Sequence, residues 1–476
     1  MTDQATTSPT TAPPAALGQT KPTVLIVGAG LAGLLLGLLL EKIKVPYHIY
    51  ERAVEVRPLG SVMTLGANIL PVFEQLGLLE ELYKISLPLY SAYIYSTDMK
   101  QVGFLDGKGQ KELTGYDMLA FSRPKLYDLM RKQVPVEKIS MNKKVIRIEE
   151  VPSEDKIRIY CVDNSHYEGH ILVGADGAYS GVRKSLYKQL DEKGVLPKED
   201  LDNFKMAYVN LVGVADFKDR GNDQTNEKYP QLKDNFGTFA QILGHDNRSW
   251  GVRNVADKQI CWSLSAQVAE PESQGLNINN AEWGPEANEA MIKQFENEPC
   301  PWGGKMGDLI EATPKNLISK VVLEDKLFKT WYHGRTVLIG DAAHKMLPGG
   351  AQGAINAMQD AVVLANSIFA LTDLSFKNIT AAFETYYHQR YSRAGGHVKR
   401  SSVMSQLMAG QTWTDRTIRH VMFNYIPEWI HQWSLSKTAE YRPQLAWLPL
   451  APNRGKGNVS PQECVRKELE ETAQAI

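Results

Sequence analysis

The sequence predicts an α/β fold: a Rossmann-like nucleotide-binding domain, an inserted and mostly antiparallel β-sheet domain, and a helical C-terminal region. Three observations predict it. Short apolar, β-branched runs followed by helical patterns are typical of buried parallel strands. Three of these runs end in turns that contain glycine. The intervening segments are richer in strand patterns, such as residues 90–95, which favours an antiparallel sheet.

The first glycine turn, Gly28-x-Gly30-x-x-Gly33, joins a strand at residues 23–27 to a helix at residues 31–42. Gly28 permits the tight turn, Gly30 lets backbone approach a pyrophosphate, and Gly33 lets the helix pack close to the strand. The helix N-terminus then presents free N–H groups to phosphates. The segment therefore predicts a dinucleotide site.

Glu51 ends the next apolar run, residues 47–50. A carboxylate there can accept both ribose hydroxyls, which favours an unphosphorylated ribose, as in FAD or NAD. Arg52 leaves NADP as an alternative ligand of this site, because an arginine at this place can bind a 2′-phosphate. Residues 24–40 carry no charge, so a membrane span is the alternative. A span needs about 20 apolar residues, however, and close glycines suit a turn better.

A second strand pattern, residues 171–173, leads into a tight turn at residues 174–177 that contains Asp176. Ser180 is a suitable N-cap for the helix that follows, and Arg183 lies in its first turn. The alternative for this segment is a solvated Asp-Gly turn without function.

A third strand pattern, residues 336–339, is followed by Asp341. A loop of small residues then runs from Pro348 to Gly353 and precedes a helix at residues 354–370. The N-terminus of that helix can hold a partial negative charge.

The composition agrees with a soluble enzyme of two or three domains. A formal net charge of −1 does not suggest nucleic-acid binding. The four cysteines are scattered, which predicts a reducing, cytoplasmic compartment and no structural metal site. The first twenty residues contain no Lys or Arg, so we expect a disordered tail rather than a secretory signal.

In this order, the three segments resemble those of the class A flavoprotein monooxygenases, the group of p-hydroxybenzoate hydroxylase. The resemblance is closer to the fungal FAD-dependent monooxygenases of secondary metabolism, and it runs from about Thr23 to Ala370. It implies FAD as the cofactor and NADPH or NADH as a transient electron donor. The chain has no second Gly-x-Gly-x-x-Gly segment, which suits a nicotinamide that visits briefly.

The resemblance also implies roles for single residues. Glu51 would bind the adenosine ribose, the segment around Asp176 both FAD and NAD(P)H, and Asp341 the ribitol chain. Arg123 begins a family pattern, Arg-x-x-Leu-x-x-x-Leu, in which Met130 replaces the last leucine. The cofactor-binding residues predicted in this way are Gly28, Gly30, Gly33, Glu51, Arg52, Thr64, Arg123, Asp176, Asp341, Pro348, Gly353 and Ala354.

The predicted FAD-binding domain is discontinuous, with residues 21–85, 119–188 and 330–372. Residues 86–118 and 189–329 would form a substrate domain whose sheet covers the flavin. Residues 373–476 would form the helical C-terminal region.

Two departures from the family pattern leave the catalytic side chain unassigned. Ala351 occupies the first glycine position of the Pro-x-x-Gly-Gln-Gly loop, and residues 206–211 lack an arginine that some fungal members use there. His344 is a candidate base, although a structural role is favoured. Four further side chains either line the substrate pocket or only pack within the sheet, namely Tyr208, Trp250, Arg253 and Trp262.

The resemblance implies a monooxygenase that hydroxylates or epoxidises an apolar aromatic or isoprenoid small molecule through a flavin C4a-hydroperoxide. The alternatives are a flavin-dependent dehydrogenase or reductase of the same fold, and a carrier of flavin or pigment without turnover. The aromatic stretch at residues 423–433 is expected to pack against the flavin domain. Its alternative is peripheral contact with a membrane, from which it would draw a lipophilic substrate.

Overall fold

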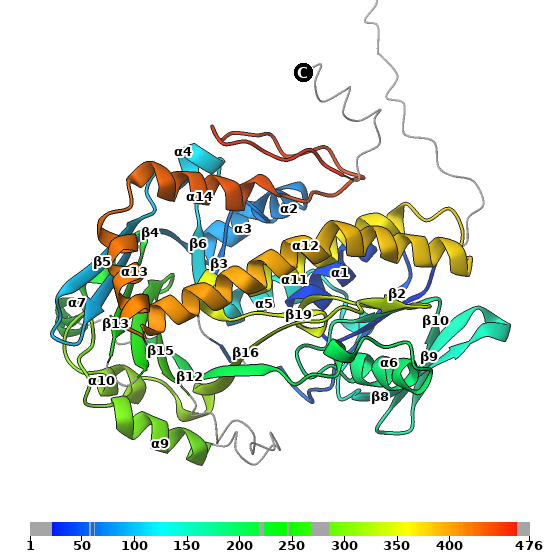
Figure 1. Ribbon diagram of the computed structural model, residues 1–476, viewed down its shortest axis with the longest axis horizontal. Helices are drawn as coiled ribbons and strands as arrows, with labels where there is room; N and C mark the ends of the chain where they lie inside the picture. The colour runs from blue at the N-terminus through cyan, green and yellow to red at the C-terminus, as the bar shows by residue number, and fades with distance from the viewer. Residues whose placement is uncertain are drawn as a thin grey trace, which may run out of the picture.

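The protein is described by a computed structural model that covers residues 21–56, 59–60, 62–218, 223–244, 247–267, 285–410 and 412–463. The predicted tail, residues 1–20, lies outside the described residues. The fold is α/β, as predicted. A parallel sheet lies at one end of an elongated molecule and a large mixed sheet at the other (Figure 1). The long helix α12 (Phe376–Ala409) runs between the two ends.

The parallel sheet holds the strands that the sequence predicted. β1 (Val24–Val27) pairs with β11 (Ile171–Gly174) on one side and with β2 (Tyr47–Tyr50) on the other. The full order is β17 (Tyr332–His333), β18 (Thr336–Leu338), β11, β1, β2 and β7 (Ile139–Ser140), and only the edge strand β17 is antiparallel.

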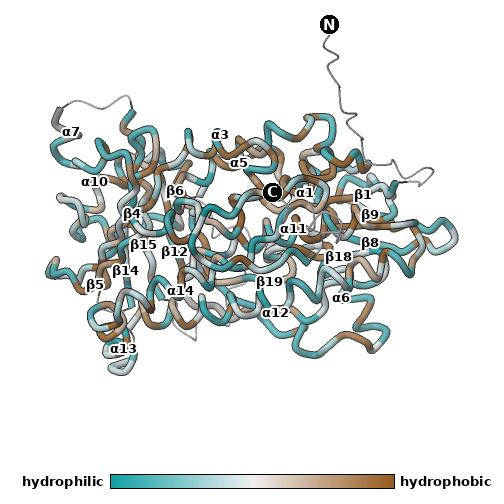
Figure 2. Tube along the Cα trace, turned by 90° about the horizontal axis from the view of Figure 1, so that it is seen from above, coloured by the Kyte–Doolittle hydropathy of each residue, from teal (hydrophilic) through white to brown (hydrophobic). Residues whose placement is uncertain are grey.

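Helix α1 (Leu31–Lys42) explains the uncharged stretch near the N-terminus. All residues from Leu31 to Leu40 are buried, and the helix packs against α11 (Gly353–Phe369). Figure 2 shows this apolar stretch in the interior. A helix that is apolar all round belongs in such a core. No helix within the described ranges is long and apolar enough to cross a membrane.

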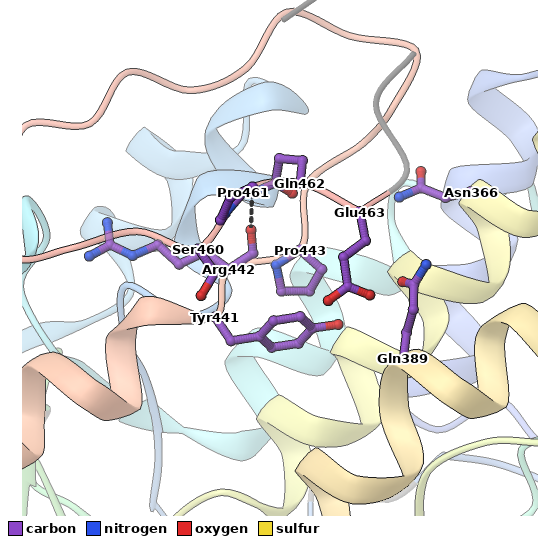
Figure 3. A pocket seen from close by; sticks show the side chains of 9 residues that line it. All are labelled: Asn366, Gln389, Tyr441, Arg442, Pro443, Ser460, Pro461, Gln462 and Glu463. Carbon is purple, nitrogen blue, oxygen red and sulfur yellow. Dashed lines mark hydrogen bonds between the residues drawn. The ribbon is translucent and has the colours of Figure 1, made fainter. Parts of the chain in front are cut away.

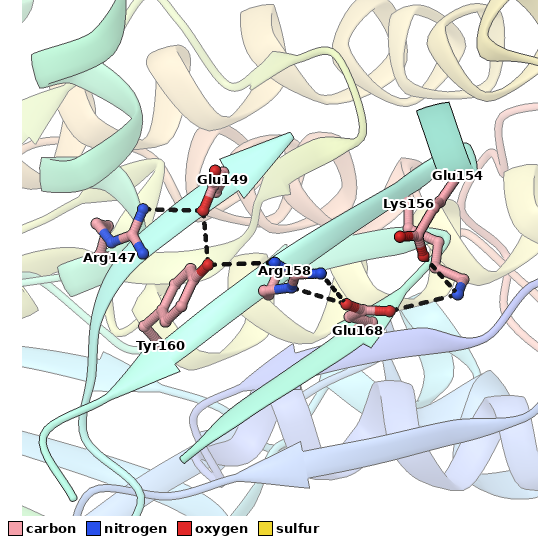
Figure 4. A network of polar contacts seen from close by, with 7 residues as sticks. All are labelled: Arg147, Glu149, Glu154, Lys156, Arg158, Tyr160 and Glu168. Atoms are coloured by element: carbon pink, nitrogen blue, oxygen red, sulfur yellow. Dashed lines mark hydrogen bonds and ion pairs between the residues drawn. The ribbon is translucent and has the colours of Figure 1, made fainter. Parts of the chain in front are cut away.

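A small antiparallel sheet flanks the parallel one, in the order β10 (His166–Gly169), β9 (Lys156–Cys161) and β8 (Val145–Val151). Its outer surface carries the polar network of Figure 4, in which Arg158 pairs with Glu168 and Tyr160 donates to Glu149. These side chains remain partly exposed to water. Such pairs contribute at most about 1 kcal/mol each to folding.

Most strands of the large sheet come from the predicted insertion, and nearly all of its strand pairs are antiparallel. The strands at residues 62–65, 119–122 and 344–345 come instead from segments that the sequence assigned to the FAD-binding domain. One of its faces packs on α9 (Pro285–Phe295) and α10 (Met306–Glu311), where Trp250, Trp262 and Phe295 form an apolar core. The strand order is β19 (His344–Lys345), β16 (Ser319–Leu327), β12 (Lys205–Asp216), β15 (Gln259–Gln267), β14 (Arg248–Val255), β13 (Gly237–Leu243), β4 (Leu87–Ser96), β6 (Leu119–Ser122) and β3 (Val62–Leu65), with β5 (Gln101–Asp106) paired to β4 and only β13 parallel to β4.

The C-terminal region is helical and then extended. After α12 come α13 (Trp413–Asn424) and α14 (Glu428–Glu440). The chain then returns without regular structure and closes a small cavity beside α11 and α12 (Figure 3). There Arg393 lies over the ring of Tyr441 at 3.9 Å and pairs with Glu463 at 2.9 Å. The remaining helices are α2 (Leu70–Gln75), α3 (Leu79–Lys84), α4 (Gln110–Thr114), α5 (Arg123–Arg131), α6 (Gly181–Glu192) and α7 (Asp223–Lys228).

The prediction that the stretch at residues 423–433 packs against the flavin domain is wrong for most of its aromatic side chains. Tyr425, Trp429 and Trp433 are 70%, 67% and 58% exposed. Helix α13 lies against β5 and α12, and α14 against α4. Apolar residues are spread around α14 instead of forming one stripe, so packing on one side leaves the others in water.

Candidate active site

The three motif turns and Glu51 follow the carboxyl ends of four neighbouring parallel strands, β18, β11, β1 and β2. Backbone hydrogen bonds between neighbouring strands align these carboxyl ends. Gly28 N donates to Tyr50 O at 2.8 Å, and Ala175 N donates to Val27 O at 2.8 Å. Open parallel sheets bind their ligands at this edge. Topology therefore gathers segments that are far apart in the chain into one site.

Two of the motif glycines stand where a side chain has no room. Gly28 has a φ of +108°, and a Cβ on it would lie 2.4 Å from the carbonyl oxygen of Ala175. A Cβ on Gly33 would lie 2.0 Å from the carbonyl oxygen of Gly28. The first turn thus packs directly on the second motif and under its own helix.

Gly30 differs from them, because a Cβ there would meet nothing within 4 Å. Gly30 is the N-cap of α1, and no side chain caps this helix. Its first turn also contains no acidic residue. Free N–H groups therefore face open space, which is the arrangement that binds phosphate.

Glu51 fixes the shape of the neighbouring loop. Its two carboxylate oxygens accept from Ala29 N at 2.8 Å and from Ala53 N at 2.9 Å. Each oxygen has a further lone pair for a ribose hydroxyl. Arg52, the next residue, is exposed, and Thr64 is buried on β3. Their contact with a cofactor remains a prediction.

The second motif is held together by Asp176. Its carboxylate accepts from Ser180 Oγ at 2.5 Å, from Gly181 N at 2.7 Å and from Val182 N at 3.2 Å. Ser180 is the N-cap of α6, as predicted, and accepts from Arg183 N at 2.9 Å. Burial raises the pKa of Asp176 despite these hydrogen bonds. The residue is therefore a cap of α6, and its contact with a cofactor remains a prediction.

Arg183 joins the second motif to the third. Its guanidinium is buried and donates to the carbonyl oxygens of Ala178 and Ala342, the latter at 2.9 Å. It also lies over the ring of Phe328 at 4.0 Å. Its place in the first turn of α6 was visible in the sequence, but its partners were not.

The third motif places Asp341 beside a cation from another segment. Arg123, at the start of α5, donates to Leu59 O at 3.0 Å. Burial lowers the pKa of Arg123, and Tyr127 and, to a smaller extent, Asp341 oppose that shift. Lys345 lies 3.9 Å from the Asp341 carboxylate. The side chain of Asp341 is 43% exposed, so it is available to a ligand.

The loop that begins at Pro348 leads into α11, which starts at Gly353. No side chain caps this helix and its first turn has no acidic residue, so the N–H groups near Gly353 and Ala354 are free to face a ligand. Ala351 stands before them with a φ of +51°, a left-handed conformation that favours glycine. The departure seen in the sequence thus falls on a strained position.

His344 is structural, as the sequence analysis favoured. It is 1% exposed, and its Nε2 lies 2.6 Å from Oδ2 of Asp360 on α11. The same oxygen accepts from Gly340 N at 2.9 Å. Sequence reasoning missed Asp360, although an acidic residue inside the apolar run of α11 was the available signal.

Strand alternation divides the four pocket candidates into two pairs. Trp250 and Trp262 are each 1% exposed and lie in the core under α9 and α10. Their indole nitrogens donate to Pro299 O and Thr313 Oγ1. Because successive side chains of a strand point to opposite faces, Arg253 on β14 and Tyr208 on β12 belong to the other face.

Glu324 on β16 is a buried carboxylate that sequence reasoning missed. It is 2% exposed, and its Oε1 accepts from the hydroxyl of Tyr179 at 2.8 Å. Its Oε2 makes no hydrogen bond. Burial raises the pKa of Glu324 and outweighs the hydrogen bond from Tyr179 and the charge of Lys345, which lower it. A buried carboxyl group thus lies near the third motif.

These groups fit an FAD: open space at the N-terminus of α1 for the pyrophosphate, Glu51 for the ribose, and Asp341 with Arg123 farther along. The cavity of Figure 3 includes none of the predicted cofactor residues. Within the described ranges no cluster of three or more His, Cys, Asp or Glu residues could hold a metal ion.

The family model for the FAD binding domain matches residues 21–202 and 305–401. The chain belongs to this family. Its relatives include the aurachin C monooxygenase/isomerase of Stigmatella aurantiaca, 26% identical over 388 residues that cover 81% of this chain and 89% of the relative. The FAD-dependent monooxygenase ptmM of Penicillium ochrochloron is 29% identical over 400 residues, with the same coverage of 81% and 89%. The enzyme is an FAD-dependent monooxygenase.

Solved structures share its fold. Klebsiella pneumoniae HpxO in complex with FAD and uric acid superposes with a TM-score of 0.69 at 19% identity, covering 88% of this chain and 97% of HpxO. A salicylate hydroxylase substrate complex gives a TM-score of 0.62 at 19% identity, covering 88% and 98%. Both likenesses bear on the fold alone.

Proposed function

We propose that this enzyme uses NADPH or NADH and molecular oxygen to insert one oxygen atom into a lipophilic aromatic or isoprenoid small molecule, by hydroxylation or epoxidation. The observation that carries the proposal is the gathering of the motif turns at the carboxyl ends of four neighbouring strands. The names of the relatives, among them an aurachin C monooxygenase/isomerase, support it.

In this proposal the residues of the chain bind the cofactor, orient it and shield the reacting site from water. The N–H groups of α1 hold the pyrophosphate, and Glu51 and Asp341 fix the two ends of the cofactor. The N-terminus of α11 stabilises negative charge at the flavin ring through its free N–H groups. Bound FAD supplies hydride acceptance and oxygen activation. The face of the large sheet opposite α9 and α10 keeps water away from the flavin, which prevents loss of oxygen as peroxide.

The decisive experiment follows NADPH oxidation, oxygen uptake and product mass with a panel of lipophilic aromatic and isoprenoid compounds. A true substrate should trigger matched consumption of NADPH and oxygen and gain one oxygen atom. NADPH loss without oxygen uptake would instead indicate a reductase of the same fold. A carrier would consume neither, even with bound FAD.

Peripheral membrane contact belongs to the same proposal. Four aromatic side chains of α13, α14 and their connection are more than half exposed, namely Trp413, Tyr425, Trp429 and Trp433. Trp and Tyr favour the border between lipid and water. A surface of this kind would bring the enzyme to the membrane, in which a lipophilic substrate dissolves.

A further inference from the structure

A cavity lies at the amino ends of the parallel strands, away from the edge that gathers the three motifs. Thr336 lines it and begins β18, whose carboxyl end leads to Asp341. Another wall is the second half of α6, whose first turn holds Arg183. Both α6 and the small sheet lie at the end of the molecule opposite the large sheet (Figure 1). Of the described residues that line this cavity, none is a predicted cofactor-binding residue, so it is a separate site.

The cavity has an apolar floor and a rim that is open to water. Its volume is about 150 Å³, a size at which an apolar protein cavity holds a benzene. Phe376, at the rim, is 55% exposed. The floor consists of buried side chains from β8, β9 and α6, namely Ile148, Ile157, Leu186 and Leu190. One ring therefore fits, and its apolar surface would leave water on binding.

Thr336 adds a polar group to this apolar floor. Its side chain is fully buried, and its hydroxyl makes no hydrogen bond within the described chain. A hydroxyl in that position has lost its hydrogen bonds to water without replacement, which is unfavourable for folding. A ligand oxygen that reaches Thr336 would restore one of them.

The charges at the rim balance each other. Glu150 and Lys193 both line the cavity, and Oε1 of Glu150 accepts from Arg335 N at 2.8 Å. Both also act on His333, another lining residue: burial and the charge of Lys193 lower the pKa of His333, and Glu150 opposes that shift. His333 is therefore neutral at pH 7. One positive and one negative group leave no net charge to attract an ion, so a neutral ligand is favoured.

We propose that this cavity binds a neutral compound of one ring that carries a hydroxyl group, a phenol or a cyclic alcohol. The ring fills the apolar floor, and the ligand hydroxyl forms a hydrogen bond with that of Thr336, since each can donate and accept. This site is independent of the proposed function, because the cofactor edge takes no part in it. Its occupant contacts α6 and β18, the two elements that carry the second and third motifs at their other ends.

The test uses full-length, FAD-loaded protein without NADPH and three probes followed by fluorine NMR: 4-fluorophenol, fluorobenzene and 4-fluorobenzoate. 4-Fluorophenol should bind more tightly than fluorobenzene, although it is the less hydrophobic of the two, because only its hydroxyl can donate to Thr336 and accept from it. The anionic 4-fluorobenzoate should bind at least about tenfold more weakly than 4-fluorophenol. Tightest binding of 4-fluorobenzoate, or no binding of 4-fluorophenol at millimolar concentration, would overturn the proposal.

Two variants assign the binding to this cavity. Thr336→Val keeps the shape of the side chain and removes the hydroxyl, so it should reverse the order of 4-fluorophenol and fluorobenzene. Without ligand it should melt at a higher temperature than wild type, because an unpaired buried hydroxyl is gone. Leu190→Trp narrows the cavity and should abolish binding of both neutral probes.

Thr385→Val is the matched control, because Thr385 is exposed on α12 and donates to Ala381 O. It should bind all three probes as wild type does. If Thr336→Val keeps the wild-type order, or Leu190→Trp still binds 4-fluorophenol, the probe lies elsewhere and the proposal is wrong. Thr336→Val alone decides the question if Leu190→Trp folds poorly.

Discussion

Asp360 of α11 and Arg390 of α12 form an ion pair from which water is excluded, with 2.7 Å between Oδ1 and Nε and no exposed surface on either side chain. The second oxygen of Asp360 holds His344 and Gly340 N. Burial opposes ionisation of Asp360, but the charges of His344 and Arg390 outweigh it and keep its pKa below the usual value. One carboxylate thus fastens two helices to the turn that presents Asp341.

Asp360→Asn should therefore destabilise the protein strongly. Removing one partner leaves Arg390 charged and buried, which costs about 3–5 kcal/mol of unfolding free energy. Urea unfolding at pH 7 measures this loss of unfolding free energy. Asp191→Asn is the control, because Asp191 is exposed on α6. A loss below about 1 kcal/mol would show that the pair contributes little.

The pH dependence of this difference has a defined sign. The folded pKa of Asp360 is lowered, so its stabilising contribution is complete above the unfolded Asp pKa of about 3.9 and is lost as pH falls further. The difference in unfolding free energy between wild type and Asp360→Asn should be constant from pH 7 to about pH 5 and should become smaller in more acidic solution. Unfolding curves across this range test it. A gap that widens on acidification would contradict the assignment.

Glu51→Ala should weaken FAD binding. The variant loses the predicted ribose contact and also the acceptor of Ala29 N and Ala53 N. Hydrogen bonds to a charged group contribute about 1.5–3 kcal/mol, which corresponds to an increase of roughly 10- to 150-fold in Kd. Flavin fluorescence titration measures it. Glu55→Ala, an exposed carboxylate in the same loop, should bind FAD as wild type does. Full flavin occupancy of Glu51→Ala at micromolar protein would remove Glu51 from the site.

Ala351→Gly should retain bound FAD but couple NADPH oxidation less tightly to oxygen insertion. Glycine relieves the left-handed strain of about 1–2 kcal/mol, and the extra freedom of the unfolded chain offsets about half of it. A looser loop beside the flavin would let water reach the reacting site, so more hydrogen peroxide should form per NADPH. Ala370→Gly, an exposed position at the other end of α11, is the control. An unchanged or lower peroxide yield in Ala351→Gly would show that this methyl group does not shape the site.

The double variant Trp429→Ser, Trp433→Ser should lose affinity for lipid. Burying even half of a Trp side chain in an apolar phase stabilises by about 2 kcal/mol, so partition into phosphatidylcholine vesicles should fall at least about tenfold. Co-sedimentation measures it. Val162→Ser changes an exposed apolar residue outside α13 and α14 and should have no effect. Equal sedimentation of wild type and the double variant would argue against membrane contact.

Local patterns predicted the parts of the fold that depend on local chemistry. Strands near Gly28 and Asp176, the start of α6 after Ser180 and the limits of α1 follow from apolar runs, glycines and a capping hydroxyl. Pairs that depend on strand register or on helix packing could not be read in that way. Arg390 lies thirty residues from Asp360 and on another helix, and the exposure of Trp429 depends on which side of α14 meets α4.

The contact between the turn at Gly28 and the carbonyl oxygen of Ala175 has a consequence for engineering this protein. The two turns are separated by about a third of the chain, yet a side chain added at Gly28 would strike the second turn. Grafting the first glycine segment into another scaffold without its second partner would leave the turn unsupported. A recombination library of relatives should therefore exchange the segments around Gly28 and Ala175 together, and chimaeras that take them from different parents should fold without retaining flavin.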